Sequence, residues 1–144
     1  MAGIQANQFN KLARKLTELG QAKFVENELT AAAFDIEADA KMNASMIAKA
    51  PPELKQMINT ELVFTDSIKK AIIRQNFLPM GAYMEFGTGV YVKVAPEWKD
   101  MAWQFYVNGK GRLRATPYMY PAFIKGRANL LRLLRLRLKQ ELAK

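Results

Sequence analysis

The chain has 144 residues, half of them hydrophobic, and a formal net charge of +9. It contains neither cysteine nor histidine, which excludes disulfide frameworks, thiolate nucleophiles and the commonest general base. These absences weigh against an enzyme, and we expect no catalytic set, no metal site and no cofactor. Because no apolar run is long enough to cross a bilayer and the N-terminus does not resemble a signal peptide, we expect a single-domain protein of the cytosol with no membrane partner.

The positive charge is concentrated at one end of the chain. Residues 1–50 and 51–106 each carry equal numbers of basic and acidic side chains, whereas residues 107–144 carry ten basic groups against Glu141 alone. Such asymmetry indicates a polyanionic partner, or an acidic neighbouring surface in an assembly.

The N-terminal third predicts two helices. A short amphipathic helix is expected over 5–19, with Gly20 as its stop. A longer helix is expected over 21–49, and Pro51 and Pro52 end it because proline cannot donate its amide. Its apolar stripe consists of Val25, Leu29, Ala33, Ile36, Ala40 and Ile47.

The middle of the chain predicts mixed structure. Residues 53–59 fit one or two helical turns, and the β-formers within 62–75 predict one or two strands. The alternation over 90–94 predicts a half-buried strand, and 97–106 has apolar residues at helical spacing.

The final helix is expected over 121–142, with leucines on two faces. Its core stripe is predicted to be Ile124, Leu131, Leu134, Leu138 and Leu142. Leu133 and Leu136 fall on the opposite side, so they are candidate interface residues. The predicted fold is α+β, with a long N-terminal and a long C-terminal helix packed on a small antiparallel sheet. We expect one domain over 1–144, made of a helical arm (1–20) and a main part (21–144).

The basic C-terminal region has three open interpretations. The helix would lie on a membrane or in a partner's groove, contact DNA through salt-sensitive attraction, or simply present a solvated basic face. The candidate contacts to DNA or an acidic partner are Lys110, Arg112, Arg114, Arg132, Arg135 and Arg137. Within this region, the loop 108–112 fits an anion cradle, although an ordinary exposed loop is favoured.

Two further features have competing interpretations. Glu85 lies between aromatics and beside Gly87, so it would be a buried, perturbed acid or, as we favour, a carboxylate that accepts backbone amides at a turn. The aromatic residues Trp98, Trp103, Phe105 and Tyr106 would form a stacking platform or, preferably, part of the core.

Two stretches, Tyr83–Gly89 and Pro117–Ala122, resemble the gene-product-ten-like neck and tail-completion proteins of tailed bacteriophages. In that family an aromatic–Val–Glu–Phe–Gly–Thr run precedes a Pro–aromatic–apolar–x–Pro–Ala helix start. A long helix ending in Ala-Pro is also similar, matched here by Ala50-Pro51, and Asp66-Ser67-Ile68 resembles the family's strand start. The resemblance spans roughly residues 21–143 in matching order.

The chain departs from the family pattern in two places. The family often carries Asp-Thr-Gly after Ala-Pro, where this chain has Pro52-Glu53-Leu54. The segment 97–114, which holds both tryptophans, is longer than the usual connection. Neither departure touches the two central motifs.

The resemblance implies a non-enzymatic virion protein. Such a protein is one subunit of a homo-oligomeric ring at the head–tail junction, around the DNA channel and against other neck and tail proteins, and it occupies the host cytoplasm during assembly. The turn that anchors the final helix would be shaped by the motif residues Tyr83, Glu85, Phe86, Gly87, Thr88, Pro117, Tyr118 and Pro121.

Two alternatives from other classes remain. A free-standing, non-specific nucleic-acid-binding protein would explain the charge equally well. A carboxylate-and-metal nuclease would need its acids to cluster, and the scattered candidates are Asp66, Glu85, Glu97 and Asp100.

Overall fold

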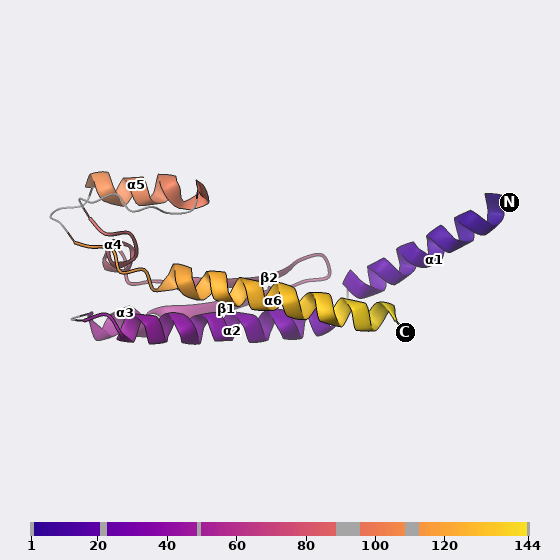
Figure 1. Cartoon of the computed structure of the whole chain (residues 1–144), viewed down its shortest axis with the longest axis horizontal. Helices are drawn as coiled ribbons and strands as arrows, with labels where there is room; N and C mark the ends of the chain where they lie inside the picture. Colours follow the sequence, from indigo (N-terminus) through magenta and orange to yellow (C-terminus); the bar gives the residue numbers. More distant parts are fainter. Residues whose placement is uncertain (1, 21–22, 49, 89–95, 109–112, 144) are drawn as a thin grey trace.

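The computed structural model describes residues 2–20, 23–48, 50–88, 96–108 and 113–143. These residues form a mostly helical α+β fold with a two-stranded antiparallel sheet, as the sequence predicted (Figure 1). In chain order the elements are α1 (Ala2–Gly20), α2 (Lys23–Ser45), α3 (Pro52–Gln56), β1 (Ile58–Phe64), β2 (Lys69–Gln75), α4 (Met80–Phe86), the 3-10 helix η1 (Pro96–Trp98), α5 (Lys99–Asn108) and α6 (Met119–Leu142).

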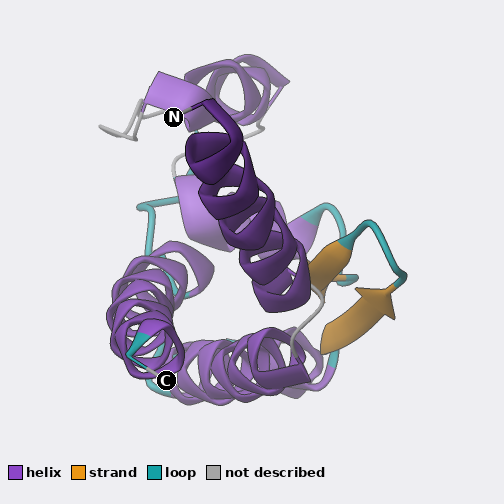
Figure 2. Cartoon of the chain, turned by 90° about the vertical axis from the view of Figure 1, so that its right-hand side faces the viewer, coloured by secondary structure: helices purple, strands orange, loops and turns teal. Residues whose placement is uncertain are grey.

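The body of the molecule is built on the packing contact between α2 and α6, which is called the seam below. The two helices run alongside each other with the hairpin β1–β2 nearby (Figures 1 and 2). The side of α2 toward this seam buries mainly small residues: Ala32, Ala33, Ile36, Ala40 and Ala44. From α6, Ala122 and Gly126 are buried. A Cβ on Gly126 would lie 2.1 Å from Cγ1 of Ile36, so the two helices approach closely because this position has no side chain.

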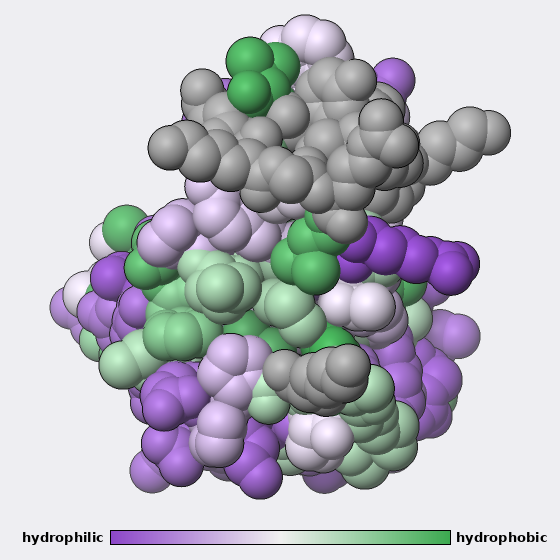
Figure 3. Space-filling model, turned by 90° about the vertical axis from the view of Figure 1, so that its left-hand side faces the viewer, coloured by the Kyte–Doolittle hydropathy of each residue, from purple (hydrophilic) through white to green (hydrophobic). Residues whose placement is uncertain are grey.

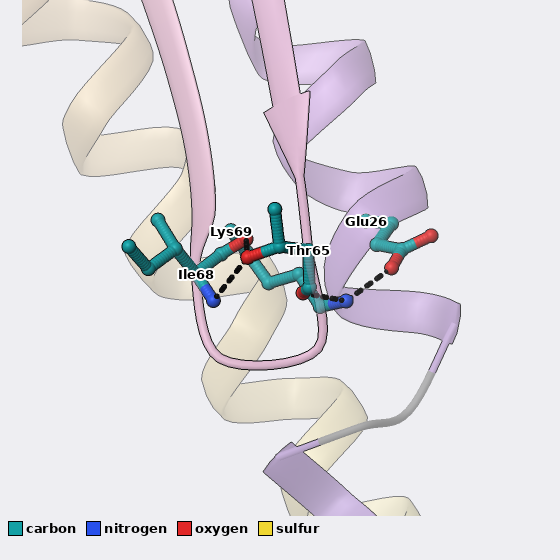
Figure 4. Close-up of polar contacts among 4 residues, drawn as sticks. All are labelled: Glu26, Thr65, Ile68 and Lys69. Atoms are coloured by element: carbon teal, nitrogen blue, oxygen red, sulfur yellow. Dashed lines mark hydrogen bonds and ion pairs between the residues drawn. The ribbon is translucent and has the colours of Figure 1, made fainter.

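The hairpin pairs Ile58 with Gln75 at its open end and Phe64 with Lys69 at its turn. Within the turn, the backbone N–H of Ile68 donates to Oγ1 of Thr65 over 3.1 Å. Lys69 donates from Nζ to the carbonyl of Thr65 over 2.9 Å and also pairs with Glu26 of α2 (Figure 4). The turn is therefore held against the beginning of α2.

The strands predicted within 62–75 are confirmed, but β1 begins earlier than expected. The sequence predicts a helical turn that includes Ile58 and Asn59, whereas α3 ends at Gln56 and both residues pair with β2. Antiparallel pairing satisfies their backbone groups and buries Ile58 completely, which outweighs weak local helix propensity. The strand expected over 90–94 and the loop over 109–112 lie outside the described residues.

The predicted core stripe of α6 is wrong. Ile124, Leu131, Leu138 and Leu142 are exposed, and Leu134 is only partly buried. The helical period explains the error: Ala122, Gly126 and Leu133 share the other face because they are spaced by four and then seven residues, about one and two helical turns. The small residues there let α6 approach the alanines of α2. Leu133 is accordingly half-buried in this seam, whereas Leu136 is exposed.

The first helix, α1, leads away from the body (Figures 1 and 2). Among the described residues it packs extensively on no other element, and a hydrogen bond of 3.4 Å joins Nζ of Lys15 to the carbonyl of Leu142. Phe9, Leu12 and Leu16 recur along one side of α1 and are all exposed. None of the described helices is both long and apolar enough to span a membrane.

Candidate functional site

The two sequence motifs meet at the start of α6 through Glu85. This residue lies on α4 and is 9% exposed. Its Oε2 accepts hydrogen bonds from the backbone N–H groups of Tyr118 (2.8 Å) and Met119 (2.9 Å), and its Oε1 accepts one from Tyr120 (2.9 Å). The carboxylate therefore acts as the N-terminal cap of α6, a place where unsatisfied N–H groups and the helix dipole favour negative charge.

This geometry is the one favoured for Glu85 from the sequence: a carboxylate that accepts backbone amides at a turn. The cap comes from a residue more than thirty positions away because Tyr118, at the N-cap position, makes no side-chain capping bond. The helix begins at Met119, two residues before the start expected at Pro121. Pro121 falls in the first turn, where an N–H has no partner within the helix.

Tyr118 also holds the junction at which α4 meets the start of α6. Its side chain is completely buried, and its hydroxyl donates to the carbonyl of Gly81 over 3.2 Å. Gln75, at the end of β2, donates from Nε2 to the Tyr118 hydroxyl (3.0 Å) and to the carbonyl of Leu54 (2.8 Å). The junction thus ties α6 to α3, α4 and the sheet.

Burial raises the pKa of Tyr118 to about 12, since the phenolate would lose its hydration. The hydrogen bond from Gln75 works against this rise in pKa, and the negative charge of Glu85 adds to it. Tyr118 therefore stays neutral over the physiological range and serves as a hydrogen-bonded anchor.

The turn after α4 begins at Gly87, which has φ of +76°. A Cβ here would lie 2.8 Å from the carbonyl oxygen of Leu113, so only glycine fits both the backbone angle and the space. Thr88 and Leu113 exchange two hydrogen bonds of 2.9 Å: the N–H of Thr88 donates to the Leu113 carbonyl, and the N–H of Leu113 donates to Oγ1 of Thr88. The backbone N–H of Thr116 donates to the carbonyl of Met84 (2.8 Å), so 113–116 runs beside the end of α4.

The remaining motif residues have different surroundings. Tyr83 and Phe86 lie within α4, not in a turn as the glycines nearby suggested. Both rings contact Phe105 of α5, with centroids 5.7 Å apart in each pair, edge-on for Tyr83 and stacked for Phe86. Pro117 is exposed immediately before the cap.

The expectation that the aromatic residues of 98–106 belong to the core is only partly right. Phe105 is half-buried against α4 and Trp98 is half-buried, but Trp103 is 53% exposed. Ala102 is the buried residue of α5, and among the described elements this helix packs mainly on α4 and the adjoining η1, so its other side stays exposed. The side chain of Tyr106 lies outside the described residues.

The basic candidates that the structure describes do not converge on one site. Arg132 and Arg135 are exposed on the outer face of α6, and Arg114 is exposed before the cap. Arg137 instead faces α2 and donates from Nε to Oε1 of Glu28 over 3.1 Å. The remaining two candidates, Lys110 and Arg112, lie outside the described residues.

The outer face of α6 combines charge with apolar surface. A shallow, open depression of about 380 Å³ runs along it, lined by Ala128, Leu131, Arg132, Arg135, Leu136 and Lys139. It is formed by one helix and has no enclosing walls, so its shape suits an extended partner better than a small molecule.

No catalytic arrangement emerges from the acids. Within the described ranges, no three side chains of Asp or Glu gather as a metal would require, and the carboxylate of Glu85 is occupied by the backbone of α6. Comparisons of the chain with family models, curated proteins and solved structures find no match.

Sequence reasoning missed Gln75 and Gly126, which complete the junction and the seam. The signal for Gln75 was a polar residue at the end of an apolar strand pattern. For Gly126 it was a glycine inside a long helix, which costs about 1 kcal/mol relative to alanine and so indicates a close contact.

Proposed function

We propose that this chain is a structural virion protein of a tailed bacteriophage, a neck or tail-completion subunit that forms a ring at the head–tail junction around the DNA. The observation that carries the proposal is the contact of the two motifs resembling that family. They lie thirty residues apart in the chain, and Glu85 of the first caps the helix that the second begins.

Exposed apolar surface supports an assembling subunit. α1 carries Phe9, Leu12 and Leu16 on its surface, and α6 carries Leu131 and Leu138. Single exposed apolar residues are ordinary, but rows of them along two helices are typical of surfaces that bind other proteins. The end of the molecule bearing α3 and α4 also shows hydrophobic surface (Figure 3), and exposed Leu78 and Met80 lie at the start of α4.

The exposed cations of α6 support a place beside a polyanion. Arg132 and Arg135 are exposed and no carboxylate lies between them on the helix. Their positive potential can therefore attract the phosphates of a nucleic acid. In this proposal the outer face of α6 lines the DNA channel or meets an acidic neck protein. The particle would be assembled in the host cytoplasm, as the resemblance implies.

The test is imaging of the purified protein by negative stain, alone and with double-stranded DNA. A closed ring with an open axis is expected, and DNA would thread it or leave it unchanged. Irregular aggregates or filaments in place of closed rings would contradict the proposal, because a connector must close around one axis.

A free-standing nucleic-acid-binding protein is the second candidate, favoured by the exposed row Arg132, Arg135 and Lys139. It predicts tight DNA binding by the single chain with a steep salt slope. Replacing the three by glutamine would then reduce affinity and the slope together. Lys55, Arg74 and Lys70, also exposed but on other elements, provide a charge-matched control set.

A further inference from the structure

We propose that the outer face of α6 is the docking surface for an acidic amphipathic helix of a partner protein. This inference deepens the proposed function, on which it rests, by naming the class of partner that α6 meets. The contact is built on one row of residues, called the heptad row below, which consists of Ile124, Ala128, Leu131, Arg135, Leu138 and Leu142.

The heptad row has the spacing of a surface that pairs with another helix. Its members follow one another at intervals of four, three, four, three and four residues, which is the a/d pattern of coiled coils. All six are exposed, with Leu131 at 44%, Leu138 at 41% and Leu142 at 46%. At 1.5 Å per residue the row is about 27 Å long. A second helix laid along it would remove these aliphatic side chains from water.

The depression on α6 lies at the positions where a facing helix inserts a side chain. In paired helices each inserted side chain fits a hole formed by four residues of the opposite helix. Four of the residues that line the depression of about 380 Å³ have the i, i+3, i+4, i+7 spacing of such a hole: Ala128, Leu131, Arg132 and Arg135. The open shape of the depression is thus the shape expected of one helix whose partner is absent.

The charges beside the heptad row favour an acidic partner. Arg135 lies within the row, and Arg132 and Lys139 lie at the flanking e positions, which set partner choice in coiled coils. Within the described part of the chain, none of these three cations forms an ion pair. Arg132 donates to the neutral Oδ1 of Asn129 over 3.3 Å. Carboxylates on a facing helix would therefore pair with cations that the chain itself leaves unneutralised.

A second copy of the chain does not meet this requirement. Two α6 helices would place their basic flanks beside each other, which is destabilising at short range. Residues 9–18 of α1 carry three cations and one carboxylate, so α1 is excluded by the same argument. The acidic helix α2 has most of its carboxylates paired with cations of its own chain: Glu26, Glu28, Glu37 and Asp39. The partner is therefore a different protein.

Duplex DNA and an anionic lipid surface are the competing occupants, and each satisfies only part of the face. Phosphates would pair with the cations but would leave the aliphatic members of the heptad row in water. A lipid surface would take up apolar side chains, but Arg135 interrupts the row, and the aliphatic members Leu131 and Leu138 each expose less than half of their surface. An acidic helix satisfies both the apolar row and its charges.

Binding of designed peptides to the full chain tests the proposal. The probe is a fluorescent helical peptide of about four heptads, with leucine at a and d and with glutamate at e and g, where the like charges keep it from pairing with itself. Its matched control carries lysine in place of every glutamate. Fluorescence anisotropy should show that the glutamate peptide binds at least about tenfold more tightly than the lysine peptide.

Variants of the chain locate the contact. Leu131→Ser/Leu138→Ser should weaken binding of the glutamate peptide about tenfold, because apolar burial is lost. The charge reversal Arg132→Glu/Lys139→Glu should invert the preference, so that the lysine peptide binds better. The matched control is Lys55→Glu/Lys70→Glu, which reverses two exposed cations on α3 and β2 and should leave the preference for glutamate unchanged.

Three results would overturn the proposal. The first is equal binding of the two peptides, and the second is an unchanged preference after the charge reversal on α6. The third is tighter binding of duplex DNA or of phosphatidylserine vesicles, lost on the same reversal, which would assign the face to a nucleic acid or a membrane. Imaging of the natural protein separates the two claims. Closed rings without a peptide preference refute the docking helix alone, whereas the preference without rings refutes the neck function alone.

Discussion

The two faces of α2 are built in opposite ways. The inner face, toward α6 and the sheet, buries Ala33, Ala40 and Ala44, whereas the outer face exposes Phe34 and Met42. A protein that folded only for its own stability would place its larger apolar side chains inside, where burial contributes about 25 cal/mol per Å².

The same contrast recurs on α6, where Ala122 and Gly126 are inside and Leu131 and Leu138 are outside. Close helix approach therefore holds the chain together and leaves the bulky residues exposed, where the proposed assembly would use them. Substitutions that add volume to the inner seam should therefore destabilise the fold. Substitutions on the outer faces should leave the fold stable but weaken the proposed assembly.

The largest loss of stability is expected from removing the negative charge that caps α6. Glu85→Gln replaces a carboxylate that accepts three backbone amides with a group whose NH₂ cannot accept them. We expect a loss of about 3 kcal/mol in the free energy of unfolding, measured by urea denaturation. Glu61→Gln, which removes an exposed partner of Arg74, should cost less than about 1 kcal/mol. Equal losses would refute the capping role.

A smaller effect is expected from one carbon added to the seam. Gly126→Ala places a Cβ against Ile36, and we expect about 2 kcal/mol of destabilisation by overpacking, despite alanine's better helix propensity. Ala128→Leu adds more volume on the exposed side of the same helix and should change stability by less than about 0.5 kcal/mol. If Gly126→Ala proved stabilising, the seam would be looser than described.

The pH dependence of stability gives the next effect. Because the pKa of Tyr118 is raised from 10 to about 12 in the folded chain, its deprotonation favours unfolding. Its contribution is complete below pH 10 and is lost as pH rises toward 12, by about 1.4 kcal/mol at pH 11. Urea unfolding at pH 9 and 11 should show this extra loss in the natural chain relative to Tyr118→Phe. Parallel losses in both proteins would show that Tyr118 does not titrate in this way.

The smallest effect on folding is expected on the outer face. Phe34→Ser should alter the unfolding free energy of the dissociated chain by no more than about 0.5 kcal/mol, yet weaken association measured by sedimentation. Ile36→Ser, two residues away on the inner face, should unfold the chain far more readily. A Phe34→Ser chain that assembles normally would remove the outer face of α2 from the interface.

Local patterns predicted the elements well but not their partners. Helical spacing located α2 and α6, and β-branched residues located the hairpin. The faces of α6 were exchanged because leucine is normally the best sign of a buried stripe, and here glycine and alanine mark it instead. Nothing in the local sequence distinguishes a leucine that stays exposed from one that packs in the core.

The candidate site was predictable in its chemistry and not in its geometry. A lone carboxylate between aromatics beside glycine suggested backbone amides as partners for Glu85. Which amides these are depends on a contact across more than thirty residues, made through Tyr118 and Gln75, and the sequence does not specify such a distance. The basic residues were predicted as one group, but Arg137 pairs with Glu28 because it falls on the seam side of α6.

The most direct test of the central claim, that the outer faces serve assembly, is solution mass by light scattering across protein and salt concentration. The account predicts a discrete multiple of the chain mass that persists at high salt, because salt screens charges but does not weaken apolar burial. A single-chain mass at every concentration and salt level would contradict it.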